Sequence, residues 1–200
     1  MAFRPTDRTR ARAAAAKERI VTAALEQLAD GGYASASMAA VARRAGVATG
    51  SVYRHFPSKG DLFAEVFRQA SQREVDVLVA LGHRTMPVQE RLAAWVGAFV
   101  HRALAEPVRA YALIAEPVDP AVEAERLTFR RAYADLFARA LADLPHPHPD
   151  IAAAAIVGGL AEALVGPLAR RDADADELTA ALTAFTLSAV GAAHAAEPVA

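Results

Sequence analysis

The stretch from Ser37 to Lys59, SMAAVARRAGVATGSVYRHFPSK, decides the fold of the amino-terminal part of this 200-residue chain. A short helix is predicted over Met38–Ala45, and Gly46 ends it because glycine tolerates the left-handed backbone that closes a helix. A second short helix is predicted over Thr49–Phe56, and Pro57 ends it because the residue before proline avoids helical angles. Two short helices joined by a tight glycine turn form a helix-turn-helix.

The side chains expected at the contact between these two helices allow the helices to cross at a steep angle. Small side chains at Ala42 and Ala45 allow close approach, and Val41, Val47 and Val52 supply an apolar seam. A second helix packed in this way leaves its outer face free to enter the major groove of DNA, with its amino-terminal residues at the base edges.

The region before the helix-turn-helix is basic. Residues 1–12 form a predicted solvated arm that carries Arg4, Arg8, Arg10 and Arg12, and a helix is expected from about Ala13 to the Gly31-Gly32 pair. Residues 1–70 contain 11 Lys/Arg against 6 Asp/Glu, whereas residues 71–200 contain 11 against 17. A basic amino-terminal part followed by an acidic remainder suggests that the amino-terminal part binds a polyanionic partner.

The rest of the chain is helical in pattern. Apolar residues recur at spacings of three and four, and no segment alternates with a period of two, so an all-α fold of around nine helices is predicted. Further helices are expected over about 59–82, 87–105, 108–115, 121–144, 150–171 and 175–195. The predicted organisation is an arm and helix-turn-helix domain over 1–58, a connecting helix over 59–82 and a larger helical domain over 83–200, to which the family resemblance described below assigns ligand binding and dimerisation.

Composition argues against several classes of protein. The chain has no cysteine, which excludes a disulfide framework, a cysteine-ligated zinc site and a thiol sensor. No phosphate-cradling glycine loop and no nucleophile motif occurs. His146 and His148 lie in a proline-rich loop without enough neighbouring ligands for a metal site. We therefore expect no catalytic residue, no cofactor and no metal.

One apolar segment, Ile151–Ala169, has the length of a membrane span. It consists mostly of Ala and Gly and contains Glu162 and Pro167, so a buried or interfacial helix is the better interpretation. No secretory signal is visible, because charged residues interrupt the alanines after the basic amino terminus. A cytoplasmic location without membrane association is expected.

The stretch from Gly46 to Phe63 resembles the signature of the tetracycline-repressor (TetR) family of transcriptional regulators. It has a Gly-Val turn, a glycine inside the second helix, an aromatic-x-His-Phe ending and a lysine at the start of the next helix. The resemblance covers residues 13–70 closely and the remainder only in helical character and length. Ala48 stands where the family often has serine, and Ala40 where it often has an acidic residue, so each removes one capping interaction.

The resemblance implies a homodimer that binds a near-palindromic operator in double-stranded DNA and, in most members, represses transcription until a small molecule releases it. The residues that it assigns to DNA are Ser37, Arg43, Arg44, Thr49, Gly50, Ser51, Tyr53, Arg54, His55 and Lys59. Hydroxyl groups at the start of the second helix suit base edges, and the basic residues, Lys59 included, suit phosphates. The arginine arm suits the minor groove.

The resemblance also implies a ligand cavity among the middle helices. Its expected lining residues are Trp95, Phe99, Arg102, Tyr111, Phe129, Tyr133 and Phe137, with Glu116 and Arg130 as further polar candidates. The alternative for the aromatic residues is a plain helical core. Helices 150–171 and 175–195, rich in small residues, are expected to form a four-helix dimer interface, unless the same residues serve the core of one subunit.

Three other functions remain possible at the level of sequence. The regulatory domain could lack a ligand, which would give a constitutive DNA-binding protein. The regulator could activate transcription instead of repressing it. The chain could also be a helical enzyme or carrier in which the helix-turn-helix is incidental.

Overall fold

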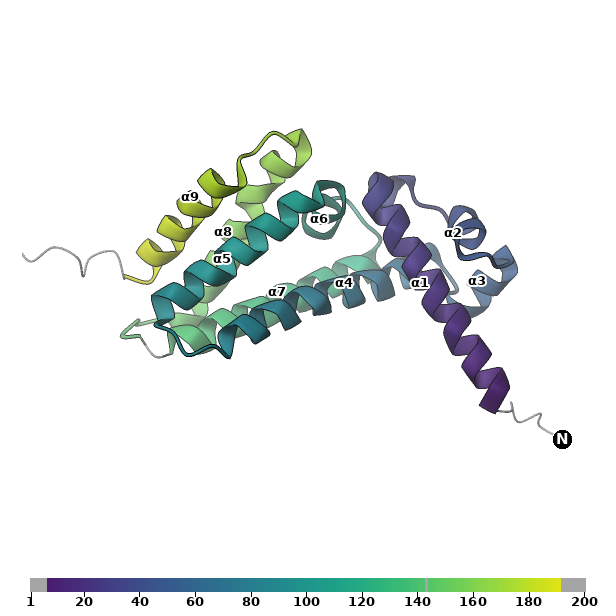
Figure 1. The fold of residues 1–200 in the computed structure, drawn as a ribbon, viewed down its shortest axis with the longest axis horizontal. Coiled ribbons are helices and arrows are strands. Elements are labelled where there is room, and N and C mark those ends of the chain that lie inside the picture. The colour runs from purple at the N-terminus through teal and green to yellow at the C-terminus, as the bar shows by residue number, and fades with distance from the viewer. Residues whose placement is uncertain (1–6, 143, 192–200) are drawn as a thin grey trace, which may run out of the picture.

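The computed structural model describes residues 7–142 and 144–191, and these residues form helices without any strand (Figure 1). The all-α prediction is confirmed, and the described residues contain the expected nine helices. They are α1 (Asp7–Ser35), α2 (Met38–Ala45), α3 (Thr49–His55), α4 (Lys59–Gly82), α5 (Val88–Ala105), α6 (Pro107–Ile114), α7 (Pro120–Leu141), α8 (Pro149–Arg170) and α9 (Ala175–Ala189). Arg4 of the expected arm and residues 192–195 of the expected last helix lie outside the described residues.

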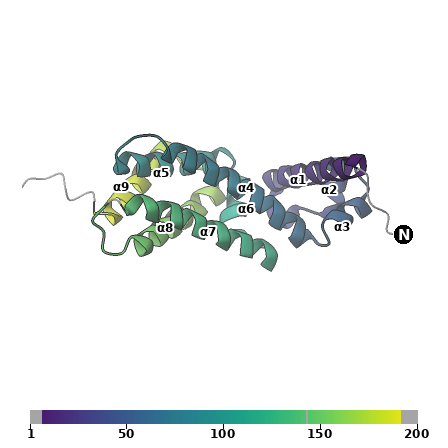
Figure 2. The same cartoon turned by 90° about the horizontal axis from the view of Figure 1, so that it is seen from below.

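Helices α1, α2 and α3 form one end of the molecule, with the first part of α4 beneath them (Figures 1 and 2). Their core contains Ile20, Leu28, Val41, Val52 and Phe63, all fully buried. The seam predicted from the valines is therefore present, and it fixes α3 against α2 by its inner face.

Local capping sets the bounds of α2. The Ser37 hydroxyl accepts a hydrogen bond from the Ala40 amide, with 3.3 Å between the two atoms, and Gly46 closes the helix in the left-handed conformation at φ 65°. No side-chain cap is present at Ala48 before α3. The missing cap agrees with the departure from the family pattern that was noted at this position.

The first helix differs from the sequence prediction at both ends. It begins at Asp7, so Arg8, Arg10 and Arg12 are exposed to solvent as expected but lie on the helix itself and not on an arm before it. Asp7 favours an early start, because it stands in the first turn and pairs with Arg10. Gly32 breaks the helical geometry as expected, at φ 75° and ψ −176°, but a short helical turn resumes to Ser35.

The remaining helices build a second core at the other end of the molecule. Helix α4 packs along α7, α5 packs against α9, and α7 packs against α8 (Figure 2). The ring of Trp95 packs against that of Phe137 at 5.1 Å between centroids, and its indole N–H donates to the Leu78 carbonyl at 2.8 Å. This buried hydrogen bond ties α5 to α4.

Helix α8 is the one described helix that is long and apolar enough to cross a membrane by length and composition. In the folded chain its residues Ile156, Leu160, Leu164 and Leu168 are buried against neighbouring helices. Ile151, near its start, is 68% exposed. The packing matches the expectation of a buried or interfacial helix.

Candidate nucleic-acid interface and ligand cavity

Helix α3 has a buried inner face and an open outer face. Val52 and Phe56 are buried, whereas Thr49, Gly50 and Arg54 are exposed. A side chain added at Gly50 would meet no other atom of the protein within 4 Å. The absence of a side chain there is therefore not required by internal packing, and it leaves room for an external surface to approach the backbone.

The other residues assigned to DNA lie around this outer face. Tyr53 is 50% exposed, while Ser51 and His55 are half-buried. Arg43 is exposed on α2. No Asp or Glu occurs between Gly31 and Gly60, so the surface of α2 and α3 carries basic and hydroxyl groups without a carboxylate of its own.

Two basic residues have internal partners that the sequence did not predict. The Arg44 guanidinium pairs with Asp30 at 2.6 Å and with Glu26 at 3.7 Å on α1. The Lys59 ammonium donates to the Tyr33 carbonyl at 2.7 Å and lies over the Tyr33 ring. The Lys59 ammonium is thus engaged at the end of α1, and its predicted phosphate contact stays a prediction.

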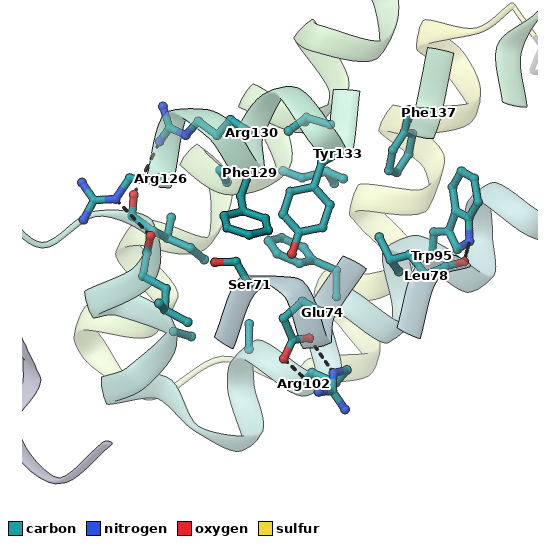
Figure 3. A pocket seen from close by; sticks show the side chains of 18 of the residues that line it. Ser71, Glu74, Leu78, Trp95, Arg102, Arg126, Phe129, Arg130, Tyr133 and Phe137 are labelled. Carbon is teal, nitrogen blue, oxygen red and sulfur yellow. Dashed lines mark hydrogen bonds and ion pairs between the residues drawn. The ribbon is translucent and has the colours of Figure 1, made fainter. Parts of the chain in front are cut away.

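A cavity of about 110 Å³ lies among α4, α5, α6, α7 and α8 (Figure 3). Six of the seven residues predicted to line it do so: Trp95, Phe99, Arg102, Phe129, Tyr133 and Phe137. Tyr111 is not among the lining residues and packs instead against a separate apolar cluster that includes Leu164 and Leu168. Its neighbours Ala110, Leu113 and Ile114 face the cavity.

One wall of the cavity carries an ion pair. The Arg102 guanidinium donates two hydrogen bonds to the Glu74 carboxylate, at 2.6 and 2.8 Å, and the Tyr133 and Ser71 side chains lie beside this pair (Figure 3). The hydrogen bonds that Arg102 donates to Glu74 raise the pKa of Arg102. Burial, followed by the nearby charge of Glu74, raises the pKa of Tyr133, so its hydroxyl is a neutral hydrogen-bonding group at physiological pH.

Three arginines line the end of the cavity formed by α6 and α7. Arg109 pairs with Glu106 at 2.5 Å, and Arg126 pairs with Glu123 at 2.5 Å. Arg130 approaches the Ile114 carbonyl at 3.5 Å. The cavity therefore combines an aromatic interior with a cationic end, an arrangement that suits a ligand with an apolar body and an anionic group.

Sequence reasoning missed four polar lining residues: Ser71, Glu74, Arg109 and Arg126. Spacing could have revealed most of them. Ser71, Glu74 and Leu78 recur at three and four on α4, and Arg126 precedes Arg130 by one turn on the α7 face that carries the predicted aromatics. Glu116, expected as a polar group of the cavity, instead binds the backbone after Gly32.

Residues 20–66 match the family described as bacterial regulatory proteins, tetR family. An uncharacterised HTH-type transcriptional regulator of Mycobacterium tuberculosis is 34% identical over 58 residues, which are 29% of this chain and 30% of that protein. The HTH-type transcriptional repressor KstR of Rhodococcus jostii is 42% identical over 57 residues, which are 28% of this chain and 27% of the repressor. The match thus spans less than a third of the length of these curated relatives.

The likeness to solved structures extends over most of the chain. The transcriptional regulator FadR from Bacillus subtilis, solved in complex with stearoyl-CoA, has a TM-score of 0.73 at 17% identity, over 86% of this chain and 98% of that chain. At this identity the likeness shows the fold. The sequence match to the tetR family thus falls in α1–α4, and the fold shared with the FadR regulator includes the remaining helices.

Proposed function

We propose that this protein is a sequence-specific DNA-binding transcriptional regulator, and that it represses its target genes until a small molecule in the cavity releases it from the operator. The observation that carries the proposal is the geometry of α3. Its inner face is anchored by Val52 and Phe56, and its first turn exposes Thr49 and Gly50 and leaves Ser51 half-buried beside them. That geometry suits a recognition helix in the major groove.

Each residue of the outer face has a chemical role in this proposal. The Thr49 and Ser51 hydroxyls contact base edges, and Gly50 lets the backbone come close to the DNA. Tyr53, Arg54 and His55 contact phosphates or the edge of the groove. Arg43 and the Ser37 hydroxyl contact the backbone beside α2, as does Arg44 if it exchanges its α1 carboxylates for a phosphate.

The protein acts as a homodimer through α8 and α9. Ile151 on α8 is 68% exposed and Phe185 on α9 is 44% exposed, although both are large apolar residues. The exposed positions of α8 include Ala154 and Ala155, and no atom lies within 4 Å of a side chain added at Gly158. Small residues beside exposed apolar ones favour close packing of a second copy, which would place two α3 helices in successive major grooves about 34–36 Å apart.

The ligand is an amphipathic anion with an apolar chain or ring system. The aromatic interior and the three arginines support this class, and the stearoyl-CoA bound by the FadR regulator of the same fold is one example of it. The cavity of about 110 Å³ is smaller than the range of about 300–1,000 Å³ that is usual for pockets of drug-sized ligands. A ligand of that size therefore has to displace the walls of the cavity, so its binding moves the helices that form them.

The relatives and neighbours are transcriptional regulators, which favours a regulatory role over an enzymatic one. We assign the protein no catalytic residue, and we place it in the cytoplasm, where a DNA-binding regulator finds its target. A ligand-independent or activating regulator is the second candidate function. Unchanged operator affinity across a panel of acyl-CoA thioesters and other amphipathic anions would favour that candidate.

The proposal is tested by selecting bound DNA from a random-sequence duplex pool with the purified protein at two salt concentrations. We expect enrichment of one short inverted repeat and binding that weakens steeply as salt rises. The absence of any enriched sequence, both with and without added stearoyl-CoA, would overturn the proposal. Footprinting on the enriched site would then give the spacing of its two halves.

A further inference from the structure

The end of α1 is held by a turn that lies more than 80 residues away in sequence. Gly32 breaks the helical geometry directly before Tyr33 and Ala34. Both amides donate to the carboxylate of Glu116, at 2.7 and 2.9 Å. Glu116 belongs to the connection between α6 and α7, so a residue of the regulatory part caps the backbone of the DNA-binding part.

Tyr33 is the centre of this contact. Besides its amide, its hydroxyl donates to Asp119, and its carbonyl accepts from the Lys59 ammonium at 2.7 Å. Its buried ring meets Phe63 edge-on at 5.2 Å between centroids. We call the set of Gly32, Tyr33, Lys59, Glu116 and Asp119 the Tyr33 junction, and it joins α1, α4 and the α6–α7 connection at one point.

Burial shapes the electrostatics of this junction. Burial lowers the pKa of Lys59, while the charges of Asp119 and Glu116 oppose that effect. Burial and the hydrogen bond to Asp119 raise the pKa of Tyr33. The raised pKa keeps the Tyr33 phenol neutral near neutral pH, so its hydroxyl can donate to Asp119.

Arg126 fixes the position of Glu116. Its guanidinium donates to the carbonyl oxygens of Leu113 at 3.0 Å, Ala112 at 3.1 Å and Glu116 at 2.7 Å. These carbonyls belong to the end of α6 and the turn after it, which carry unsatisfied acceptors and partial negative charge. Arg126, Leu113 and Ile114 are also among the residues that line the cavity. Figure 3 shows Arg126 on the same side of the cavity as Arg130.

We propose that Arg126 is the positioning residue that couples the cavity to the DNA-binding domain. A ligand that displaces the end of α6, or that draws the Arg126 guanidinium toward its own anionic group, moves Glu116 away from the amides of Tyr33 and Ala34. Helix α1 then loses its cap, and the α1–α3 unit changes its orientation on α4. The proposal rests on the proposed function and names the contact through which ligand binding reaches the operator. The ligand acts only through its differential affinity for the two arrangements.

The test compares Arg126→Met and Arg126→Lys with Arg131→Met, a matched control at an exposed position of the same helix. Lysine keeps the charge, but its single ammonium does not reproduce the planar set of donors of arginine. The first readout is hydrogen exchange of the Tyr33 and Ala34 amides, which requires neither DNA nor ligand. We expect both Arg126 variants to speed exchange of these two amides by about tenfold or more, with α5 and α9 unchanged.

The second readout is affinity for the selected operator. We expect both Arg126 variants to differ from wild type by at least about threefold in operator Kd, and Arg131→Met to match wild type. Unchanged exchange at Tyr33 and Ala34 in Arg126→Lys and Arg126→Met would overturn the proposal, as would an operator affinity equal to that of Arg131→Met. If the wild type binds no specific DNA, the proposed function fails, and the exchange readout still decides whether Arg126 holds the junction.

Discussion

Replacement of Gly32 by alanine tests the Tyr33 junction most sharply. Gly32 has φ 75° and ψ −176°, a region that is essentially restricted to glycine. A Cβ atom at this position would lie 2.8 Å from Oε2 and 3.1 Å from Oε1 of Glu116. Gly32→Ala therefore strains the backbone and also drives away the carboxylate that caps Tyr33 and Ala34.

The expected loss of stability in Gly32→Ala follows from these two effects. Backbone strain in this region costs about 1–3 kcal/mol. Loss of hydrogen bonds to a charged group costs about 1.5–3 kcal/mol for each bond in a buried setting, and solvent recovers part of this at Ala34, where the contact is exposed. The expected loss in free energy of unfolding is about 3–5 kcal/mol.

Gly46→Ala provides the matched control. Gly46 also has a positive φ, of 65°, but no atom lies within 4 Å of an added Cβ. The expected loss in free energy of unfolding comes from backbone strain alone and is about 1–2 kcal/mol. The assay is urea unfolding followed by far-ultraviolet circular dichroism at one fixed protein concentration.

A third measurement separates strain from the lost contact. In a Glu116→Ala background, Gly32→Ala should lower the free energy of unfolding only by the backbone strain, because the carboxylate that the new Cβ would displace is already absent. The reasoning would be refuted if Gly32→Ala cost no more than Gly46→Ala, or if its cost were the same with and without Glu116.

Three further predictions concern other parts of the molecule. Trp95→Phe removes the indole N–H that donates to the Leu78 carbonyl, together with part of a buried ring, and should cost about 1–3 kcal/mol in urea unfolding, and a loss below 0.5 kcal/mol would contradict the hydrogen bond at 2.8 Å. Asp174 caps α9, and its hydrogen bonds to two backbone amides lower its pKa. Because a depressed carboxyl pKa stabilises the fold above the unfolded pKa, the melting temperature of Asp174→Ala should fall below wild type at pH 7, and the gap should close as pH drops below about 4. Ile151→Asp should shift the protein toward monomer in analytical ultracentrifugation without loss of helical content, and an undisturbed dimer would remove α8 from the proposed interface.

The helix-turn-helix was predictable because its determinants are local. The cap at Ser37, the left-handed Gly46 and the break at Pro57 each act within a few residues of the helix end that they define. The aromatic wall of the cavity was predictable for a related reason. Phe129, Tyr133 and Phe137 recur every four residues, so one face of one helix carries them whatever α7 packs against.

The junction at Tyr33 could not be predicted from local pattern. Glu116 and Tyr33 are 83 residues apart, and their contact depends on how the α6–α7 connection lies against the end of α1. The same packing directs the Lys59 ammonium to the Tyr33 carbonyl, a contact that the motif did not indicate. Tyr111 was misplaced because α6 has only eight residues, and the rotation of so short a helix depends on its neighbours more than on its own pattern.

The central claim is that the first turn of α3 reads base edges. The most direct measurement is binding of wild type, Thr49→Ala, Ser51→Ala and Arg43→Ala to every single-base-pair variant of the selected operator. We expect the two hydroxyl deletions to relax discrimination by about 1–3 kcal/mol at one or two base pairs in each half-site, and Arg43→Ala to weaken binding evenly across all sequences. A base-preference profile that stays unchanged in both Thr49→Ala and Ser51→Ala would contradict readout by α3.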